Sequence, residues 1–407
     1  MTTTEKLRLG IALEGAGWHP AAWREPSSRP QELFTPAYWT DVVRIADQGG
    51  VDFATIEDSF GLQSSRPFAP DSRTDEVRGR LDALLLAARL APVTDRIGLI
   101  PTVTTTHTEP FHVSKAVATL DYASLGRAGW QPKVSGRADE ARHVGRRDIP
   151  EIVDYNNDPA VQAVVADLFA EAADVVEVVR RLWDSWEDDA EIRDVETDRF
   201  LDADKLHTVD FSSDRFSVRG PSITPRPPQG QPVVASLGHA TLPYRFAAAS
   251  SDLLFVTPVD LASAAAILAE VRDAEAFVGR EGEALRVYAD ILAFLDGDEK
   301  AADRLARLDA LGRELTSDTR IFTGSAAELA DEIAGLGALG YAGVRLRPGV
   351  VTDDLPRIAQ DLVPELRRRD LVAIEDEPVS LRARLGLPTF VPNRYATAPT
   401  TDATVLA

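Results

Sequence analysis

Short apolar runs alternate with segments of helical periodicity along most of the chain. Each run has the length and composition of a buried strand. The runs lie at 7–13, 52–56, 97–103, 128–134, 232–236, 253–256, 286–292 and 343–346. Because strands that alternate with helices are joined by crossover connections, this pattern predicts a parallel sheet. Eight such units close most naturally into a (β/α)8 barrel, the TIM barrel of α/β proteins.

The segments between the runs carry apolar residues at positions i, i+3, i+4 and i+7, the spacing of one helix face. These stripes lie in 81–88 (Leu81, Leu84, Leu85 and Ala88), 113–120 and 169–176. Helix start signals agree with the pattern. Thr35 before Pro36 predicts an N-cap followed by proline in the first turn, and Ser325 with Glu328 predicts a capping box.

Three long, polar, proline-containing stretches interrupt the alternation, at 60–76, 135–159 and 186–231. Loops of this length in a compact domain are usually lids or binding loops. The chain has no repeat of fixed period and no break in composition. We therefore expect one domain over 1–395 with insertions at the strand ends, and a flexible tail over 396–407.

Composition limits the classes of function. The 44 basic and 65 acidic residues give a net charge of −21, which argues against nonspecific binding to nucleic acids or anionic membranes. The chain has no cysteine, which excludes disulfides, thiolate nucleophiles and cysteine-ligated metals. No stretch reaches about 20 apolar residues, and the N-terminus has no signal-peptide pattern. A cytoplasmic protein is the expectation.

In such a barrel the active site lies at the carboxyl ends of the strands, so the residues that follow each run are the candidates. They include Asp58, the threonines from 102 to 106 with His107, the pair Gln131 and Ser135, and the turn at 238–241. Each also has a structural interpretation. Asp58 can cap a turn, the threonines can extend a strand, and His107 can be a hydrogen-bonded core residue. The turn at 238–241 starts a helix, where backbone amides favour phosphate.

Several common catalytic motifs are absent from the sequence. There is no phosphate loop of the G-x-x-x-x-G-K-[ST] type, no G-x-S-x-G nucleophile elbow and no H-E-x-x-H pair. The six histidines are scattered without metal-ligand spacing, so no metal site is predicted.

The block RIGLIPTVTTTHTEPFHVSKAVATLDYASLGRAGWQPKVS, residues 96–135, resembles the bacterial luciferase-like flavin monooxygenases. The likeness is to the branch that holds nitrilotriacetate, dibenzothiophene-sulfone and long-chain alkane monooxygenases. Further similar segments are VDFATIEDS, RLWDSWEDDA, DRFSVRGPSITPRPPQGQPVV and VPELRRRDL, so the resemblance covers about 7–395.

This resemblance implies a (β/α)8 barrel that holds reduced FMN at its carboxyl-terminal rim. It implies a two-component monooxygenase that acts on a small organic substrate with O2 and receives reduced FMN from a separate flavin reductase. Members of the family are commonly homo-oligomers. The residues that match the family's flavin contacts are Asp58, Thr102 and Thr104 beside the ring, Gln131 and Ser135 as hydrogen-bonding groups, and Gly238, His239, Ala240 and Thr241 at the phosphate.

The sequence departs from the family pattern at three polar positions. Gln131 replaces an asparagine, Val134 replaces a threonine and Phe169 replaces a tyrosine. Three lost contacts of ~0.5–1.5 kcal/mol each would weaken FMN binding by one to three orders of magnitude. Pro132 biases Gln131 toward extended geometry. The groups expected to compensate are Arg137, Arg146, Arg147 and His239.

His107 and His143 are the candidate catalytic acid–base residues, since a histidine can exchange a proton near neutral pH. Two other functions fit the same barrel. One is a hydride-transfer oxidoreductase that uses a deazaflavin in place of FMN. The other is a noncatalytic homologue that binds a flavin or another ligand without turnover.

Overall fold

Eight parallel strands close into a barrel in the computed structural model, which describes residues 6–66, 68–152, 158–373 and 377–396. The strands are β1 (Arg8–Leu13), β2 (Phe53–Ile56), β3 (Gly98–Thr104), β4 (Gly129–Lys133), β9 (Val233–Leu237), β10 (Leu253–Val256), β11 (Arg286–Leu295) and β13 (Gly343–Pro348). They follow the order β10-β9-β4-β3-β2-β1-β13-β11, and pairing of β10 with β11 closes the ring. Each corresponds to one predicted run, so the predicted TIM barrel is confirmed.

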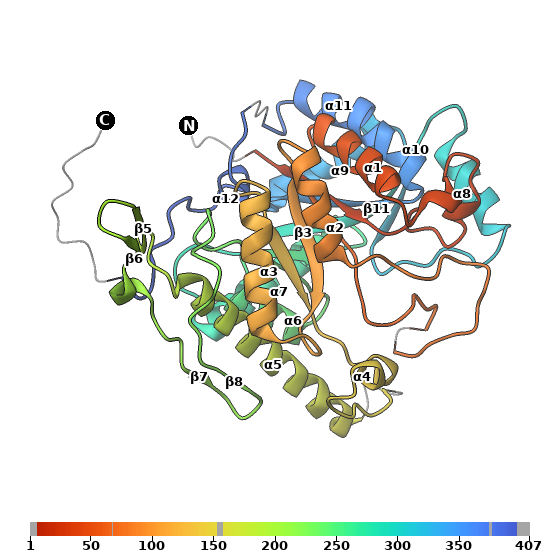
Figure 1. Ribbon diagram of the computed structural model, residues 1–407. Coiled ribbons are helices and arrows are strands. Elements are labelled where there is room, and N and C mark those ends of the chain that lie inside the picture. The colour runs from red at the N-terminus through yellow and green to blue at the C-terminus, as the bar shows by residue number, and fades with distance from the viewer. Residues whose placement is uncertain (1–5, 67, 153–157, 374–376, 397–407) are drawn as a thin grey trace.

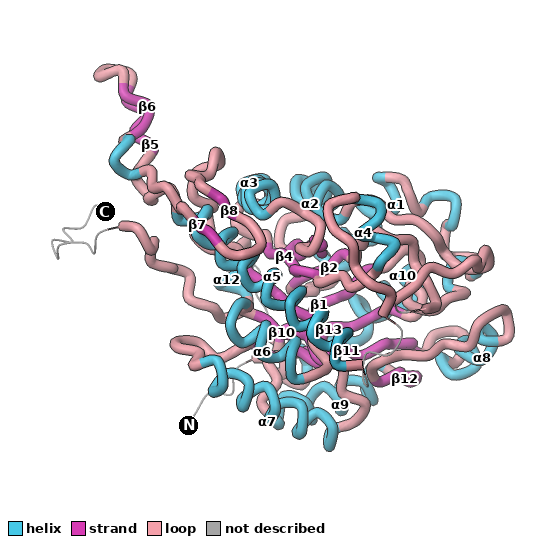
Figure 2. Tube along the Cα trace, turned by 90° about the horizontal axis from the view of Figure 1, so that it is seen from below, coloured by secondary structure: helices cyan, strands magenta, loops and turns pink. Residues whose placement is uncertain are grey.

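Helices surround the strands on the outside of the barrel (Figures 1 and 2). They are α1 (Pro36–Gln48), α2 (Ala83–Leu90), α3 (Pro110–Ala123), α5 (Pro159–Asp184), α6 (Thr241–Ser250), α7 (Leu261–Val278), α9 (Ala326–Leu339), α10 (Val351–Arg357) and α11 (Val363–Arg368). Both predicted start signals are confirmed. Thr35 accepts a hydrogen bond from the Tyr38 amide at the start of α1, and Ser325 and Glu328 form a reciprocal capping box at the start of α9.

One strand has no counterpart in the predicted pattern. β12 (Arg320–Gly324) pairs with Ile291–Leu295 of β11, a stretch that includes the end of the predicted run and the three residues beyond it. Arg320 is exposed and only Phe322 of this strand is buried, so the segment has no continuous apolar run for the pattern to detect. The strand follows α8 (Ala301–Asp309) and lies at the edge of the barrel.

The apolar stripe around α2 lies on a different face from the one that the barrel buries. The helix buries Ala83, Leu86, Ala87 and Leu90, whereas Leu85 is 68% exposed. Asp82 caps the helix by accepting a hydrogen bond from the Leu85 amide, so Leu81 lies before it. Leu84, Leu85 and Ala88 instead line a groove on the protein surface.

The three insertions differ in position. Segments 62–66 and 133–137 lie together at the carboxyl ends of the strands, and α4 (Ala138–Val144) follows the second of them. The third insertion forms two hairpins, β5 (Glu191–Asp194) with β6 (Arg199–Leu201) and β7 (Phe211–Ser212) with β8 (Ser217–Val218). The β5–β6 hairpin projects away from the barrel in Figure 2. The predicted tail lies outside the described residues, apart from Ala396. In the described part of the chain, no helix is long and apolar enough to cross a membrane.

The amino-terminal end of β4 is held by buried polar side chains. Asp121 accepts hydrogen bonds from the amides of Ala128 and Gln229 and from the Gln229 side chain. Arg127 donates to three main-chain carbonyls, those of Ile97, Ala91 and Thr94. Burial raises the pKa of Asp121 to about 6. The LDYASLGRAG part of the sequence block therefore joins α3, β3 and β4.

Candidate active site

A buried charge network fills the barrel below the carboxyl ends of its strands. Arg345 of β13 is fully buried and forms two hydrogen bonds with the carboxylate of Asp290, at 2.7 and 2.6 Å. Its guanidinium lies 4.0 Å from the centre of the Phe255 ring. Arg347, two residues along β13, also binds Asp290 and continues to Asp318. The network places the guanidinium of Arg345, paired with a buried carboxylate, under the barrel mouth.

This network holds the side chain of Gln131, one of the predicted flavin contacts. The Gln131 Oε1 atom accepts from Arg345 Nη1 at 3.2 Å, and its Nε2 donates to Thr102 Oγ1 at 3.3 Å. Because the guanidinium can only donate, it fixes which end of the amide faces it. Gln131 and Thr102, both predicted flavin contacts, therefore lie within hydrogen-bonding distance of each other, and the second N–H of the amide has no partner among the described residues.

The two acidic residues at the end of β2, Glu57 and Asp58, have different surroundings. Asp58 accepts hydrogen bonds from the amides of Ser59 and Ala83, so it caps the approach to α2, and burial raises its pKa. Glu57 lies beside the buried network, with Oε1 3.8 Å from Arg345 Nη1. This Oε1 atom is buried without a hydrogen-bond partner among the described residues.

The threonine-rich end of β3 is tied to β4. Thr104 pairs in register with Lys133, so both side chains lie on the same face of the sheet as Gln131 and Thr102. The Thr105 hydroxyl donates to the Lys133 carbonyl, and the Thr106 hydroxyl accepts from the Ser135 amide. Thr105 and Thr106 thus hold the loop in place, and Thr102, Thr104 and Ser135 are positioned at the strand ends.

The predicted phosphate turn, Gly238, His239, Ala240 and Thr241, lies at the start of α6. Ala240 is the N-cap and supplies no side-chain hydrogen bond, so the first amides of the helix are not capped. The Thr241 hydroxyl donates to the carboxylate of Glu270. Pro243 lacks an amide hydrogen, which reduces the donors available in this turn. His239 is exposed.

The two candidate catalytic histidines have different surroundings. His107 is 5% exposed, its ring meets Phe60 edge to face, and burial lowers its pKa. Its Nε2 atom is buried without a hydrogen-bond partner among the described residues. His143 is exposed on the last turn of α4. The structure therefore places His107 beneath the rim and His143 on the surface.

The arginines expected to compensate for weaker phosphate contacts all form ion pairs. Arg137, Arg146 and Arg147 pair with Asp139, Glu109 and Glu171, respectively. The two apolar replacements take part in packing. Val134 contacts the hydrophobic clusters under α4 and α5, and the Phe169 ring lies 5.7 Å from that of Phe246. Binding a phosphate through these arginines would therefore compete with existing ion pairs.

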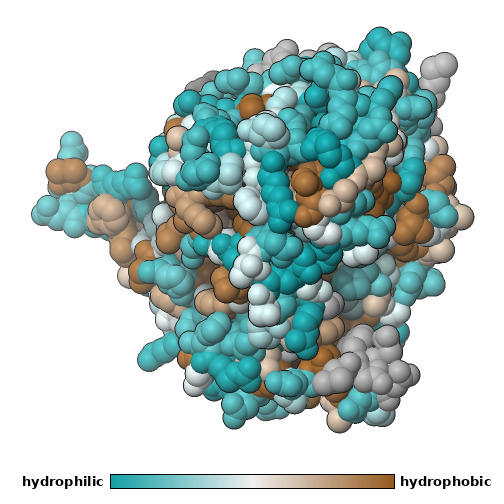
Figure 3. Space-filling view, turned by 90° about the vertical axis from the view of Figure 1, so that its right-hand side faces the viewer, coloured by the Kyte–Doolittle hydropathy of each residue, from teal (hydrophilic) through white to brown (hydrophobic). Residues whose placement is uncertain are grey.

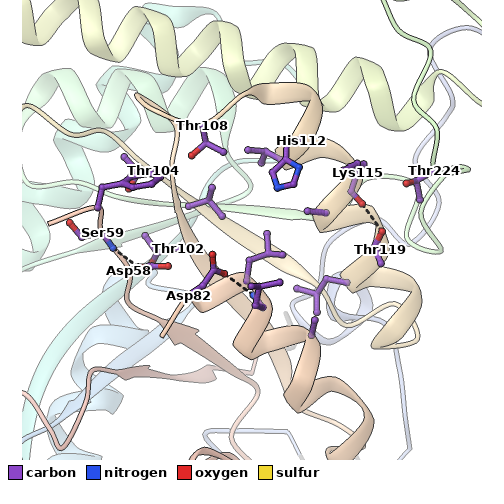
Figure 4. A pocket seen from close by; sticks show the side chains of 18 of the residues that line it. Asp58, Ser59, Asp82, Thr102, Thr104, Thr108, His112, Lys115, Thr119 and Thr224 are labelled. Atoms are coloured by element: carbon purple, nitrogen blue, oxygen red, sulfur yellow. Dashed lines mark hydrogen bonds between the residues drawn. The ribbon is translucent and has the colours of Figure 1, made fainter. Parts of the chain in front are cut away.

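Two cavities meet at Ser59, close to these residues. The larger, of about 770 Å³, is a groove between α2 and α3 that reaches Asp58, Thr102 and Thr104. Figure 4 shows Asp58, Ser59, Thr102 and Thr104 at one end of the groove and Lys115, Thr119 and Thr224 at the other. The smaller, of about 260 Å³, lies at the rim between segments 62–66 and 133–137. Figure 3, which faces the side that carries α4 and α8, shows mostly hydrophilic side chains with separate hydrophobic groups.

The donor and acceptor set at the mouth fits a flavin. A flavin ring offers both kinds of hydrogen-bonding group. The unpartnered Glu57 Oε1 can accept a hydrogen bond, and the Gln131 amide and the Ser135 hydroxyl can donate. The uncapped start of α6 suits a phosphate. Among the described residues, no group of three or more histidine, aspartate or glutamate side chains could hold a metal ion.

Sequence reasoning missed Arg345, Arg347 and Glu57 as parts of the site. A signal for the two arginines was present. They stand two apart in the short strand GVRLRP, and residues two apart in a strand lie on one face. Two arginines spaced in this way in a barrel strand indicate ion pairs inside the barrel. Glu57 was overlooked because its neighbour Asp58 matched the family pattern.

Comparison with known proteins adds an independent line of evidence. The family model described as luciferase-like monooxygenase matches residues 16–348. The chain is 33% identical over 305 residues to N-acetyl-S-(2-succino)cysteine monooxygenase of Bacillus subtilis strain 168, covering 74% of this chain and 64% of the relative. It is 32% identical over 307 residues to nitrilotriacetate monooxygenase component A of Aminobacter aminovorans, covering 74% of this chain and 65% of the relative. The matches thus span slightly less than two thirds of these relatives.

Solved structures share the fold. The crystal structure of a long-chain alkane monooxygenase superposes with a TM-score of 0.81 at 22% identity, covering 94% of this chain and 96% of that one. A riboflavin lyase, whose structure contains modified FMN and riboflavin, superposes with a TM-score of 0.80 at 22% identity and the same coverage.

Proposed function

The chain belongs to the luciferase-like monooxygenase family, and from this we propose that it is an FMN-dependent monooxygenase that oxidises a small organic substrate with O2. The observation that carries the proposal is the match over 16–348, together with two relatives above 30% identity that are both named monooxygenases. The donor and acceptor set at the barrel mouth supports it, because it fits the polar edge of a flavin.

We propose that the flavin ring lies over the ends of β2, β3 and β4. There Asp58, Thr102, Thr104, Gln131 and Ser135 would surround it, with Gly238, His239, Ala240 and Thr241 at its phosphate. Reduced FMN would supply the electrons that activate O2. The chain's own residues would orient the ring and exclude water. Arg345 would keep the Gln131 amide turned so that an N–H is presented to the mouth.

His107 is the better candidate of the two histidines for proton transfer. Its lowered pKa favours the neutral ring near pH 7, and a neutral imidazole with a free Nε2 can accept or pass on a proton. The exposed position of His143 supports a weaker role. Both assignments stay predictions.

We further propose that a separate flavin reductase delivers the reduced cofactor and that the chain forms a homo-oligomer. One relative is named component A of its monooxygenase, which supports a system of more than one component. The relatives' compounds, N-acetyl-S-(2-succino)cysteine and nitrilotriacetate, suggest a polar organic substrate for this chain.

Titration with oxidised and chemically reduced FMN tests the proposal directly. We expect micromolar or tighter binding that is stronger for the reduced form, followed by substrate-dependent O2 consumption when a reductase is added. His107→Asn should lower turnover by ~10²–10⁴ with FMN affinity retained, and His143→Asn should have a smaller effect. Absence of binding up to millimolar FMN would reject an FMN enzyme, and titration with a deazaflavin would then test the hydride-transfer alternative.

A further inference from the structure

The rim cavity of about 260 Å³ has an unusual charge for this acidic protein. Its lining includes four cationic side chains, and Glu140 is its single acidic lining residue among those described. The cations are Arg66, Arg80, Lys133 and Arg137. The protein as a whole carries a net charge of −21, so the lining of this cavity has the opposite charge balance to the rest of the chain.

Two of these four cations are neutralised by ion pairs within the protein. Arg80 forms an ion pair with Glu14 at 3.0 Å. Arg137 binds Asp139 at 2.6 Å, and its Nε atom lies 3.6 Å from Glu140. Neither arginine therefore carries an uncompensated charge.

Lys133 differs from these arginines. Its ammonium donates to the main-chain carbonyl of Asp58 at 2.8 Å, and it forms no ion pair with any described residue. An ammonium has three N–H donors, so this contact leaves two of them without an acceptor in the described part of the chain. Arg66 is the other lining cation without an ion pair in the described chain. It is exposed, with a long contact of 3.4 Å to the Pro70 carbonyl.

A second donor lies beside Lys133. Ser135 follows it by two residues and lines the same cavity. Its Oγ accepts a hydrogen bond from the Arg137 amide, so the hydroxyl hydrogen is free to donate outward. Ser59 and Gln63 have partners within the protein, whereas the Oε2 atom of Glu140 is buried without a hydrogen-bond partner among the described residues. Ser59 donates to Glu140, and Gln63 donates to Glu14 and the Gly79 carbonyl.

We propose that this cavity binds an anionic oxygen group through Lys133 and Ser135, with Arg66 closing the outer side. The group is the carboxylate of the organic substrate, or the phosphate of the cofactor if that phosphate lies here instead of at the 238–241 turn. The free ammonium donors and the adjoining hydroxyl match the acceptors of either anion, and charge-assisted hydrogen bonds of this type are the strong ones. The inference rests on the proposed function for its biological meaning, but its chemistry depends only on these side chains.

Binding measurements on two variants test the site. Lys133→Met removes the charge and keeps most of the side-chain length, and Lys133→Arg keeps the charge. Lys6→Met is the matched control, because it removes one lysine at the amino-terminal end of β1, beside Asp370. For each protein, calorimetry would give the affinity for citrate, and fluorescence would give the affinities for FMN and for riboflavin, which lacks the phosphate. Thermal melting would check folding.

A substrate-carboxylate site predicts that Lys133→Met weakens citrate binding by about 10- to 100-fold and leaves both flavins unchanged. A cofactor-phosphate site predicts instead that FMN affinity falls toward that of riboflavin, which itself does not change. Lys133→Arg and Lys6→Met should stay close to wild type in both cases. The inference is overturned if folded Lys133→Met binds citrate and FMN like the wild type. Loss of all flavin binding in the wild type, with citrate binding that still needs Lys133, would reject the proposed function and keep the anion site.

Discussion

The two ends of β4 use their polar residues differently. At the amino-terminal end, Asp121 and Arg127 are buried, and their hydrogen-bonding groups are met by main-chain atoms and by Gln229. At the carboxyl-terminal end, the Lys133 ammonium donates to one carbonyl oxygen, and Glu57 Oε1 and His107 Nε2 are buried without hydrogen-bond partners among the described residues. Asp121 and Arg127 at the amino-terminal end have hydrogen-bond partners within the protein. The side chains at the carboxyl-terminal end keep hydrogen-bonding groups available to a ligand.

This difference separates structural from functional parts of one sequence block. The residues that match the family pattern most closely, LDYASLGRAGW, mainly join α3 to the sheet. Gln131 and Val134, which depart from it, lie in the segment QPKVS at the mouth. A substitution at the first end should therefore act on folding stability, and one at the second end should act on ligand binding. Each prediction below tests that division.

The largest effect on stability is expected for Arg127→Met. The guanidinium donates to the carbonyls of Ile97, Ala91 and Thr94, and its removal leaves these buried acceptors without partners. We expect the free energy of unfolding in urea to fall by about 3–5 kcal/mol, the range for breaking a buried charged contact. FMN affinity of the protein that remains folded should be unchanged. Weaker FMN binding at unchanged stability would contradict a purely structural role for this end.

Arg345→Met should change both properties, because Arg345 lies between the core and the mouth. Asp290 keeps Arg347 as a partner, so we expect a smaller loss, of about 2–4 kcal/mol. The Gln131 amide also loses its fixed orientation, so FMN should bind more weakly. Gln131→Met and the double variant complete a thermodynamic cycle, and residues in one hydrogen-bond network couple by about 0.5–3 kcal/mol. Additive effects would show that the 3.2 Å contact does not position Gln131.

Gln131→Asn restores the residue that the family has at this position and is expected to have a smaller effect. The shorter side chain cannot reach both Arg345 and Thr102, so one hydrogen bond is lost. A cost of about 0.5–1.5 kcal/mol in the free energy of unfolding follows. Thr102→Val, which removes the other partner, is the matched control and should cost a similar amount. No change in stability would mean that the amide is not held by this network.

The sequence predicted the barrel well because its signals are local. Each of the eight strands is a short apolar run, and the caps at Thr35 and Ser325 depend on residues three or fewer positions away. The site was predicted only in part. The meeting of Gln131 with Thr102 follows from strand order, but its contact with Arg345 joins residues 214 positions apart in sequence. The pairing of Arg137, Arg146 and Arg147 with carboxylates likewise depends on tertiary structure, which residue type alone does not reveal.

The smallest effect expected is on the pH dependence of stability, where the two ends of β4 should act in opposite directions. Burial lowers the pKa of His107, so below about pH 6.5 the unfolded chain binds a proton that the folded one does not, and stability falls as the pH decreases. His19, whose pKa burial also lowers, acts in the same direction. Burial raises the pKa of Asp121 to about 6, so its contribution is present below about pH 3.9 and is lost as the pH rises through about 6.

Urea unfolding at a series of pH values between 4 and 7 separates these contributions. His107→Asn should reduce the loss of stability on acidification, because it removes the group that destabilises the fold at low pH. Asp121→Asn should increase this loss, because it removes the group that stabilises the fold at low pH. His143→Asn, on the surface of α4, is the control and should follow the wild-type curve. Identical curves for all four proteins would show that burial perturbs neither group. If the pH dependence of stability changes for Asp121→Asn alone, only the pKa of Asp121 is shifted by burial, and the His107 ring is in contact with solvent.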